Sequence, residues 1–229
     1  GFCVAGMLLF SRHLTNSVFV ASILPPTWLP IFGNWLPPLS GLLAGFGWVL
    51  SSRDRRIKLV VMGSFLAMSM YLPYRALLEP RPLVANRFQR GIYMQTTNAT
   101  CGAAAAATLL HTIGIRTTER EMVDLCFSTW RGTSLHNLLR GIAVKLEGTE
   151  WRVRVKRLTP EQLADLEAAA ILEVGLPGEE LPEDLRYVTE WGWIPGVMHT
   201  AVLFRVREDG LLDIGDPSTG RELWRREAL

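Results

Sequence analysis

The chain has 229 residues, of which 48% are apolar, and its mean hydropathy of +0.18 is high for a water-soluble protein. Its net charge of +2 is unevenly divided, because residues 1–79 hold six basic and two acidic side chains, which leaves a net charge of −2 on residues 80–229. This acidic balance excludes nucleic-acid binding by the second part on grounds of charge, and three cysteines are too few for a disulfide framework.

Residues 1–79 are predicted to be a membrane region. No charged residue occurs from Leu14 to Ser52, nor from Leu59 to Tyr74. We expect hydrophobic spans at 35–52 and 57–75 and the end of another at 1–10, so the region would hold two to three spans and would have membrane lipid as a partner. Buried core helices or a signal peptide fit these runs less well. The proline-rich stretch 24–30 is expected to be a loop along the membrane surface.

The distribution of basic residues gives opposing indications of orientation. Four basic residues lie in the loop 53–58, and four arginines follow the second span, at 75, 81, 87 and 90. The tighter cluster at 53–58 favours a cytoplasmic loop, which would place residues 80–229 on the outer face of a bacterial inner membrane. Because the chain begins with Gly, further residues are expected before it, and the number of spans is left open.

Residues 80–229 are predicted to form helices first and then mainly strands. A helix begins at Cys101 and ends near Gly114, and a capping box at 118–121 begins a second helix that ends near Phe127. Antiparallel strands are expected at 199–206 and 211–216, joined by a turn at 208–210. The other expected elements are a helix capped by Thr133 or Ser134 that ends near Leu146, an exposed strand at 151–155, a short helix after Thr159-Pro160, a buried strand at 169–174 and a strand after 221. This order predicts an α+β domain in which a helical half packs on an antiparallel sheet.

Four residues of this second part form a pattern that is typical of acyl transfer. Cys101 opens a helix, where the helix dipole and unpaired N–H groups stabilise the nucleophilic thiolate. Gln95 lies six residues upstream and can donate a hydrogen bond to an oxyanion. His199 at the start of one strand and Asp216 at the end of the next would lie side by side, so that Asp216 orients the imidazole while His199 accepts the thiol proton.

In the order of these residues the chain resembles the C39-type cysteine peptidases, papain-like domains that cleave leader peptides in bacteriocin-exporting transporters. The resemblance covers about residues 90–225, including Gln95 with Cys101-Gly102, the stretch 131–139, His199 and Asp216-Pro217. It implies a papain-like cleft in which Cys101 is the nucleophile, His199 the base, Asp216 its orienting partner and Gln95 the oxyanion donor. A peptide or protein substrate and no cofactor are implied as well.

Some features depart from that family. Ala103 stands where such domains usually have proline, a change that the first turn of a helix should tolerate. No phosphate-binding GxxxxGK[ST] loop is present, so a transporter partner is left open. Family members in transporters act on the cytoplasmic side, which opposes the orientation inferred from charge. Their cleavage after a Gly-Gly pair cannot be carried over to this chain, because the pocket residues are not identified.

Several alternatives stay open. The second part could be a catalytically silent peptide-binding module, another Cys-His-Asp acyl-transfer enzyme such as an amidase or a transglutaminase-like protein, or a structural domain. His111 lies about 15 Å along the same helix from Cys101 and cannot act as its base. His136 is expected at the surface or lining the substrate site, and Cys126 in the core. The segment 191–193 would cover the site, contact a membrane or partner, or pack in the core.

Overall fold

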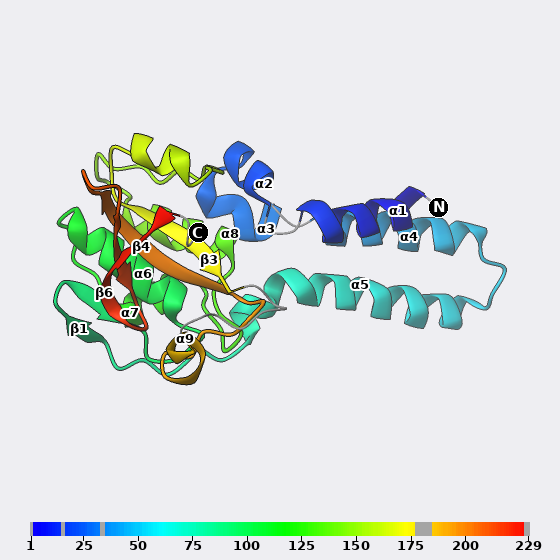
Figure 1. Cartoon of the computed structure of the whole chain (residues 1–229). Coiled ribbons are helices and arrows are strands. Elements are labelled where there is room, and N and C mark those ends of the chain that lie inside the picture. Colours follow the sequence, from blue (N-terminus) through cyan, green and yellow to red (C-terminus); the bar gives the residue numbers. More distant parts are fainter. Residues whose placement is uncertain (1, 15–16, 33–34, 177–184, 227–229) are drawn as a thin grey trace. The chain divides into compact units, whose positions relative to one another are not determined.

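The computed structural model describes residues 2–14, 17–32, 35–176 and 185–226 (Figure 1). The chain forms two compact units, Gly1–Glu79 and Pro80–Leu229, which are described separately. The boundary between the units lies where the net charge of the sequence changes from positive to negative.

All secondary-structure elements described in the first unit are helices. Its two longest helices, α4 (Leu36–Leu50) and α5 (Arg55–Leu78), pack against each other as an antiparallel pair (Figure 1). Lys58 Nζ donates a hydrogen bond to the carbonyl of Trp48, 3.0 Å away, across the turn between them. The shorter elements are α1 (Phe2–Leu9), a π-helix (Phe10–Leu14), α2 (Val18–Ile23), a 3-10 helix (Pro26–Trp28) and α3 (Leu29–Phe32). The proline-rich stretch 24–30 is therefore partly helical and not a simple loop.

The membrane spans predicted at 35–52 and 57–75 are not supported. Among the helices of the described segments, none combines the length and the apolar character that crossing a membrane requires.

The second unit begins with a small hairpin and three helices. Strands β1 (Arg87–Gln89) and β2 (Ile92–Met94) are joined by Arg90-Gly91, both with positive φ, as a two-residue type I′ turn requires. Helices α6 (Cys101–Thr112), α7 (Glu119–Leu125) and α8 (Leu135–Lys145) follow. Thr118 caps α7 by accepting a hydrogen bond from Glu121 N, and Ser134 caps α8 in the same way from Asn137 N. The three predicted helices are confirmed.

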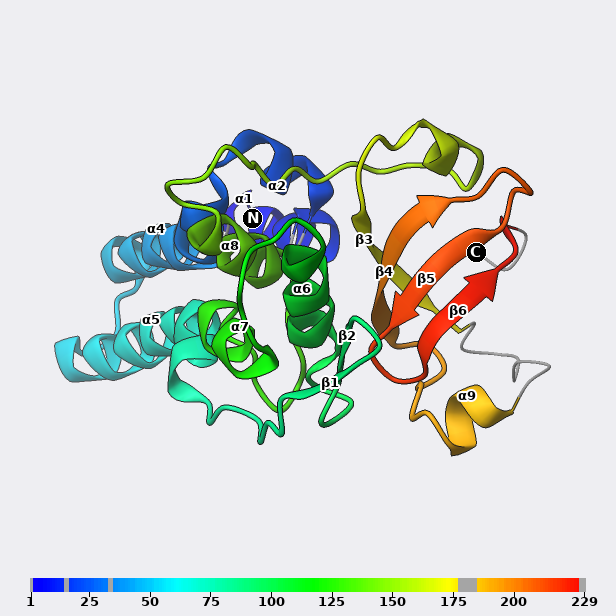
Figure 2. The same cartoon turned by 90° about the vertical axis from the view of Figure 1, so that its left-hand side faces the viewer.

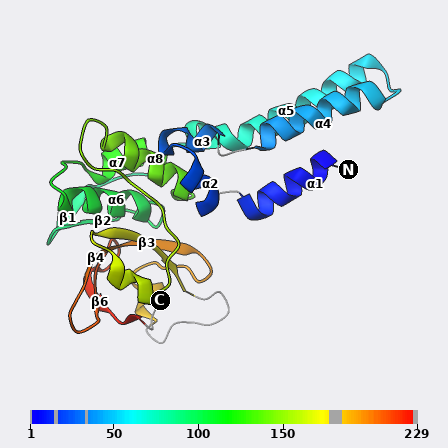
Figure 3. The same cartoon turned by 90° about the horizontal axis from the view of Figure 1, so that it is seen from above.

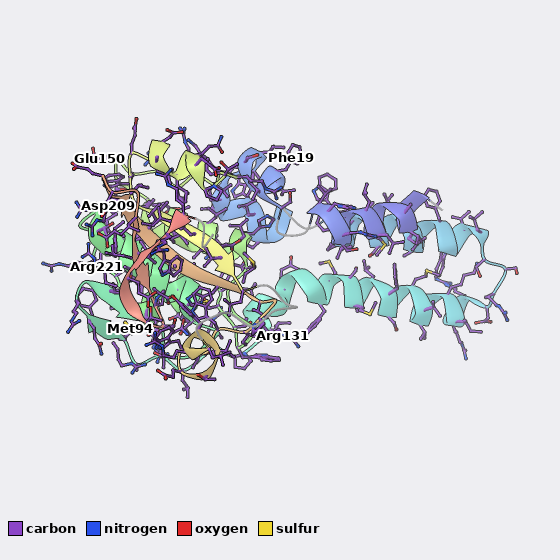
Figure 4. All side chains as sticks on the ribbon, viewed as in Figure 1. Phe19, Met94, Arg131, Glu150, Asp209 and Arg221 are labelled. Atoms are coloured by element: carbon purple, nitrogen blue, oxygen red, sulfur yellow. The ribbon has the colours of Figure 1, made fainter. Side chains whose placement is uncertain are left out.

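The rest of the second unit is a four-stranded antiparallel sheet in the order β3-β4-β5-β6. Its strands are β3 (Ala170–Gly175), β4 (Met198–Val206), β5 (Leu212–Asp216) and β6 (Gly220–Trp224), and α9 (Arg186–Thr189) lies between β3 and β4. Arg221, labelled in Figure 4, joins β6 to β5 through two hydrogen bonds of 2.8 and 2.6 Å to the Asp213 carboxylate. The predicted antiparallel pair at 199–206 and 211–216 is confirmed by the pairing of β4 with β5.

Two of the predicted strands differ from the structure. Residues 151–155 alternate in polarity but form no strand, because no neighbouring segment pairs with them in the described chain. Strand β3 lies at the edge of the sheet and is half-buried, not buried as predicted. The helix expected after Thr159-Pro160 is a 3-10 helix, Glu161–Asp165.

Helix α6 is the centre of the second unit. It lies between α7 and α8 on one side and the sheet on the other (Figures 2 and 3). All five alanines from Ala103 to Ala107 are fully buried. Their short side chains let the sheet and the two helices approach α6 closely, which packs α6 against β4, the strand that starts with Met198 and His199. A second cluster, formed by Leu163, Ala201, Leu203, Leu212 and Ile214, fills the other face of the sheet.

Candidate active site

Cys101 is the first residue of α6, as predicted, and its side chain is buried. The preceding residue, Thr100, does not cap the helix with its side chain. Instead, the Thr100 hydroxyl accepts hydrogen bonds from Thr96 N and Thr97 N and donates one to Thr97 O. The N–H groups of the first turn are therefore not occupied by the Thr100 side chain and are oriented to stabilise negative charge at Cys101.

The structure brings Cys101, His199 and Asp216 together. His199 Nε2 lies 2.9 Å from Asp216 Oδ1, and the Asp216 side chain is fully buried. Because Nε2 is engaged with Asp216, the other ring nitrogen, Nδ1, is the one available to Cys101. Cys101 Sγ also lies 3.9 Å from Thr200 Oγ1, so β4 supplies two neighbours to the thiol.

The pKa values of the thiol and the imidazole are shifted in opposite directions. Burial alone would raise the pKa of Cys101, but the hydrogen bond and the charge of His199, with a contribution from Thr200, lower it below its ordinary value. Burial likewise would lower the pKa of His199, but Asp216 and Cys101 raise it to about 9. Both shifts favour a thiolate beside an imidazolium.

Asp216 is held by Ser218, which is in turn held by a tryptophan. Ser218 donates two hydrogen bonds to Asp216 Oδ1, from its backbone N at 2.6 Å and from its hydroxyl at 2.7 Å. The hydroxyl of Ser218 in turn accepts a hydrogen bond of 3.0 Å from Trp193 Nε1. The ring of Trp193 packs on His199, with 4.3 Å between ring centroids and 37° between planes. Trp193 thus covers the imidazole and is itself buried, which fits both the site-covering and the core-packing alternatives for 191–193.

Gln95 lies in the loop between β2 and α6, where its backbone is fixed. Its N–H donates a 2.8 Å hydrogen bond to the carbonyl of Pro217, directly after Asp216. The Gln95 side chain is buried, and its Oε1 has no hydrogen-bond partner among the described residues. Among those residues, no hydrogen bond joins the Gln95 amide to Cys101. The structure therefore places Gln95 beside the end of β5.

A fully buried carboxylate, that of Glu119 at the start of α7, holds the same loop. Glu119 Oε1 accepts a hydrogen bond from Thr96 N, and Oε2 accepts one from the Thr96 hydroxyl, both at 2.8 Å. This pair of contacts fixes the residue next to Gln95. The loop is therefore attached both to the helical layer and to the sheet.

The other candidate residues lie apart from this site. His111 packs at the opposite end of α6 against Phe88, with 4.8 Å between ring centroids. His136 is buried in the first turn of α8, so the expectation of a surface position is wrong, and the alternative of a substrate-lining position stays a prediction. Cys126 is fully buried in the core, and its burial raises the pKa of its thiol to about 12.

Three residues of the site, Thr200, Glu119 and Ser218, were not assigned a role in the sequence. Thr200 and Glu119 reach the site only through tertiary packing, so no local signal marks them. Ser218 follows Asp216-Pro217, and an Asp-Pro-Ser turn is a signal for local hydrogen bonds to the carboxylate. Trp193 was noted in the sequence, but its stacking on His199 depends on the path of the chain after α9. No group of three or more His, Cys, Asp or Glu suitable for a metal ion occurs within the described segments.

Comparisons with known proteins give limited similarity. No protein-family model matches the chain, and no curated protein matches its sequence. One similar solved structure is a double glycine motif protease from an AMS/PCAT transporter in complex with the leader peptide. It has a TM-score of 0.43 and 18% sequence identity, and the match covers 66% of this chain and 89% of that one.

Proposed function

We propose that residues 80–229 are a cysteine peptidase that hydrolyses peptide bonds. The observation that carries this proposal is the buried contact of 2.9 Å between His199 and Asp216 beside a thiol whose pKa His199 lowers. A thiolate at the start of a helix, paired with an oriented imidazolium, is the arrangement that nucleophilic attack on a carbonyl requires. A binding module has no chemical need for it.

The proposed reaction has two steps. The Cys101 thiolate attacks the peptide carbonyl carbon, and the resulting oxyanion accepts hydrogen bonds from the Cys101 N–H and the Gln95 side-chain amide. His199 then gives its proton to the departing amine as the C–N bond breaks, which leaves an acyl-enzyme on Cys101. In the second step His199 removes a proton from water and the resulting hydroxide attacks the thioester carbonyl. The C–S bond then breaks, which releases the carboxylic acid product and returns Cys101 to the thiolate. Asp216 keeps the imidazole in the orientation that both transfers need.

Hydrolysis of an internally quenched peptide pool tests the proposal. The pool includes leader-like peptides with a Gly-Gly pair, the substrate class suggested by the resemblance in sequence. Cys101→Ser and His199→Ala should each reduce the initial rate by at least about a thousandfold, and Asp216→Asn by about a hundredfold to ten-thousandfold. Cys126→Ser, which changes a thiol of the same helical layer outside the site, is the matched control and should retain the wild-type rate.

Mass spectrometry of the products separates hydrolysis from other acyl transfer. In the presence of glycine amide, a peptidase releases mainly the free acid, whereas a transglutaminase-like enzyme releases the amide adduct. Hydrolysis that persists in Cys101→Ser would contradict the proposal. Tight peptide binding by the wild type without any product would instead favour the silent binding module.

We further propose that residues 1–79 associate with lipid. Large apolar side chains of α4 and α5 are exposed, among them Val49 at 79% and Leu50 at 81%. Exposed apolar surface of this extent in a single unit is unfavourable in water and typical of interaction surfaces. The basic residues at 53–58 suit anionic headgroups. The location in a bacterial inner membrane, and the side of it on which residues 80–229 lie, stay predictions from the sequence.

A further inference from the structure

An acidic side chain lies on the sheet next to the proposed nucleophile. In the register of β3 with β4, Glu173 is paired with Thr200, whose hydroxyl lies 3.9 Å from Cys101 Sγ. Residues that face each other in an antiparallel pair project from the same face, with their Cβ atoms about 5 Å apart. Ile171, two residues earlier on β3, packs in the core around α6, which shows that this face is the one toward α6. Glu173 is therefore on the Cys101 side of the sheet.

The Glu173 carboxylate is a candidate binding group for a positive charge. Its side chain is exposed, so a ligand in solution can reach it. Among the described residues, no hydrogen bond or ion pair satisfies it. Neighbouring groups nevertheless remove part of its hydration, and this burial raises its pKa above the ordinary value. A partly desolvated carboxylate without a partner favours a cation brought by another molecule.

An exposed apolar side chain lies on the same face of the sheet, one pair of residues along from Glu173. Gly175, two residues after Glu173 on the same strand, is paired with Met198 on β4. The sulfur of Met198 lies 3.4 Å from the position that a Cβ atom on Gly175 would occupy, so the Met198 side chain lies over the glycine. Met198 is 59% exposed. A thioether beside a carboxylate matches a side chain with a methylene stem and a positive end.

We infer that Glu173 and Met198 form a subsite for a Lys or Arg side chain of the substrate, close to the bond that Cys101 attacks. The methylene groups would lie on Met198 and the ammonium or guanidinium would bind Glu173. This inference rests on the proposed peptidase function, because it assigns specificity to the same cleft. The Cys-His-Asp arrangement alone does not determine whether the substrate carries a Lys or Arg side chain near the cleaved bond, and the subsite does.

Paired substrates test the subsite by hydrolysis. Acetylated tetrapeptide coumarylamides carry Lys, norleucine or Glu at each position in turn, so that norleucine keeps the stem and removes the charge. Wild-type protein should prefer Lys to norleucine by about tenfold in kcat/KM at one position. Glu173→Gln should lose this preference, because the amide carries no charge, and Glu173→Lys should prefer Glu. The matched control is Glu208→Gln, since Glu208 is an exposed residue in the turn that Asp209 marks in Figure 4, beyond the end of β4 away from His199.

Thiol-specific reagents test the same subsite without any hydrolysis. A cationic and an anionic methanethiosulfonate, which carry trimethylammonium and sulfonate groups, form a mixed disulfide with the thiolate and release methanesulfinate. Modification of Cys101 is followed by mass spectrometry of its peptide. The ratio of cationic to anionic rate constants should fall about tenfold or more in Glu173→Gln and stay unchanged in Glu208→Gln.

Together, the hydrolysis assay and the thiol-reagent assay show which of the two proposals, the peptidase function or the cation subsite, has failed. An absence of hydrolysis by wild type for every peptide would contradict the peptidase function, and the reagent ratio would still decide whether Glu173 attracts cations to the thiol. A ratio and a Lys preference that are both unaffected by Glu173→Gln would overturn the subsite. Thermal unfolding of each variant establishes that the substitutions leave the fold intact.

Discussion

At the scale of single residues, the location of one proton decides the chemistry of the site. The pKa of Cys101 is lowered and that of His199 is raised to about 9. At a pH between these two pKa values, the proton therefore resides on the imidazole and not on the thiol. The single oxygen Asp216 Oδ1 accepts hydrogen bonds from His199 and twice from Ser218. The imidazolium therefore has its counter-charge in a fixed place.

We expect a bell-shaped dependence of kcat/KM on pH. On the acid side, the rate falls as Cys101 becomes protonated, at a pH below the ordinary thiol value because its pKa is lowered. On the alkaline side, it falls near pH 9 as His199 loses the proton that it gives to the leaving amine. Initial rates from pH 4 to 10.5 with one quenched peptide measure both limbs.

Alkylation by iodoacetamide provides the control for this profile. In His199→Ala the burial of Cys101 remains and the lowering contribution of His199 is lost, so the pKa of Cys101 should rise above its ordinary value. Cys126 should stay unlabelled below about pH 10 in both proteins, because burial raises its pKa to about 12. An ordinary thiol profile for Cys101 that His199→Ala does not change would contradict the ion pair.

At the scale of elements, the close packing of α8 against the end of α7 is a sensitive point. A Cβ atom on Gly141 would overlap Cys126 Sγ and lie 2.9 Å from the Cys126 backbone N. Gly141→Ala should therefore lower the free energy of unfolding by about 1–3 kcal/mol, although alanine is the better helix former. Urea denaturation followed by fluorescence measures the change. In a Cys126→Ala background the same substitution should cost less, and equal costs in both backgrounds would show that the thiol is not the cause.

Local signals in the sequence were sufficient for those elements whose ends carry caps or turns. The capping residues Thr118 and Ser134 begin α7 and α8, and Gly210 with positive φ marks the turn between β4 and β5. The alternation at 151–155 was misleading, because a strand exists only where a partner pairs with it. Likewise, the order of Gln95, Cys101, His199 and Asp216 was readable, whereas the contacts of Thr200 and Glu119 depend on packing between distant segments.

At the scale of the whole molecule, catalysis and lipid binding should be separable. Every residue of the proposed site belongs to the unit Pro80–Leu229, and the exposed apolar helices α4 and α5 belong to Gly1–Glu79. A chain of residues 80–229 should therefore retain kcat/KM within about threefold and lose binding to phosphatidylglycerol vesicles, which is measured by flotation of both proteins. Equal flotation of the two proteins would contradict a role of residues 1–79 in lipid binding.

The hydrogen bond from Gln95 N to the carbonyl of Pro217 has a consequence for the order of events during synthesis. It joins residues that are far apart in the chain, and the contacts of His199 with Cys101 and Asp216 are similarly distant. Such long-range contacts form late, after the segments between them have been made. A ribosome-bound chain that already contains Cys101 still lacks the aspartate that orients the histidine and the carbonyl that anchors the Gln95 loop. The proposed site is therefore incomplete until β5 and the residues that follow it have been synthesised.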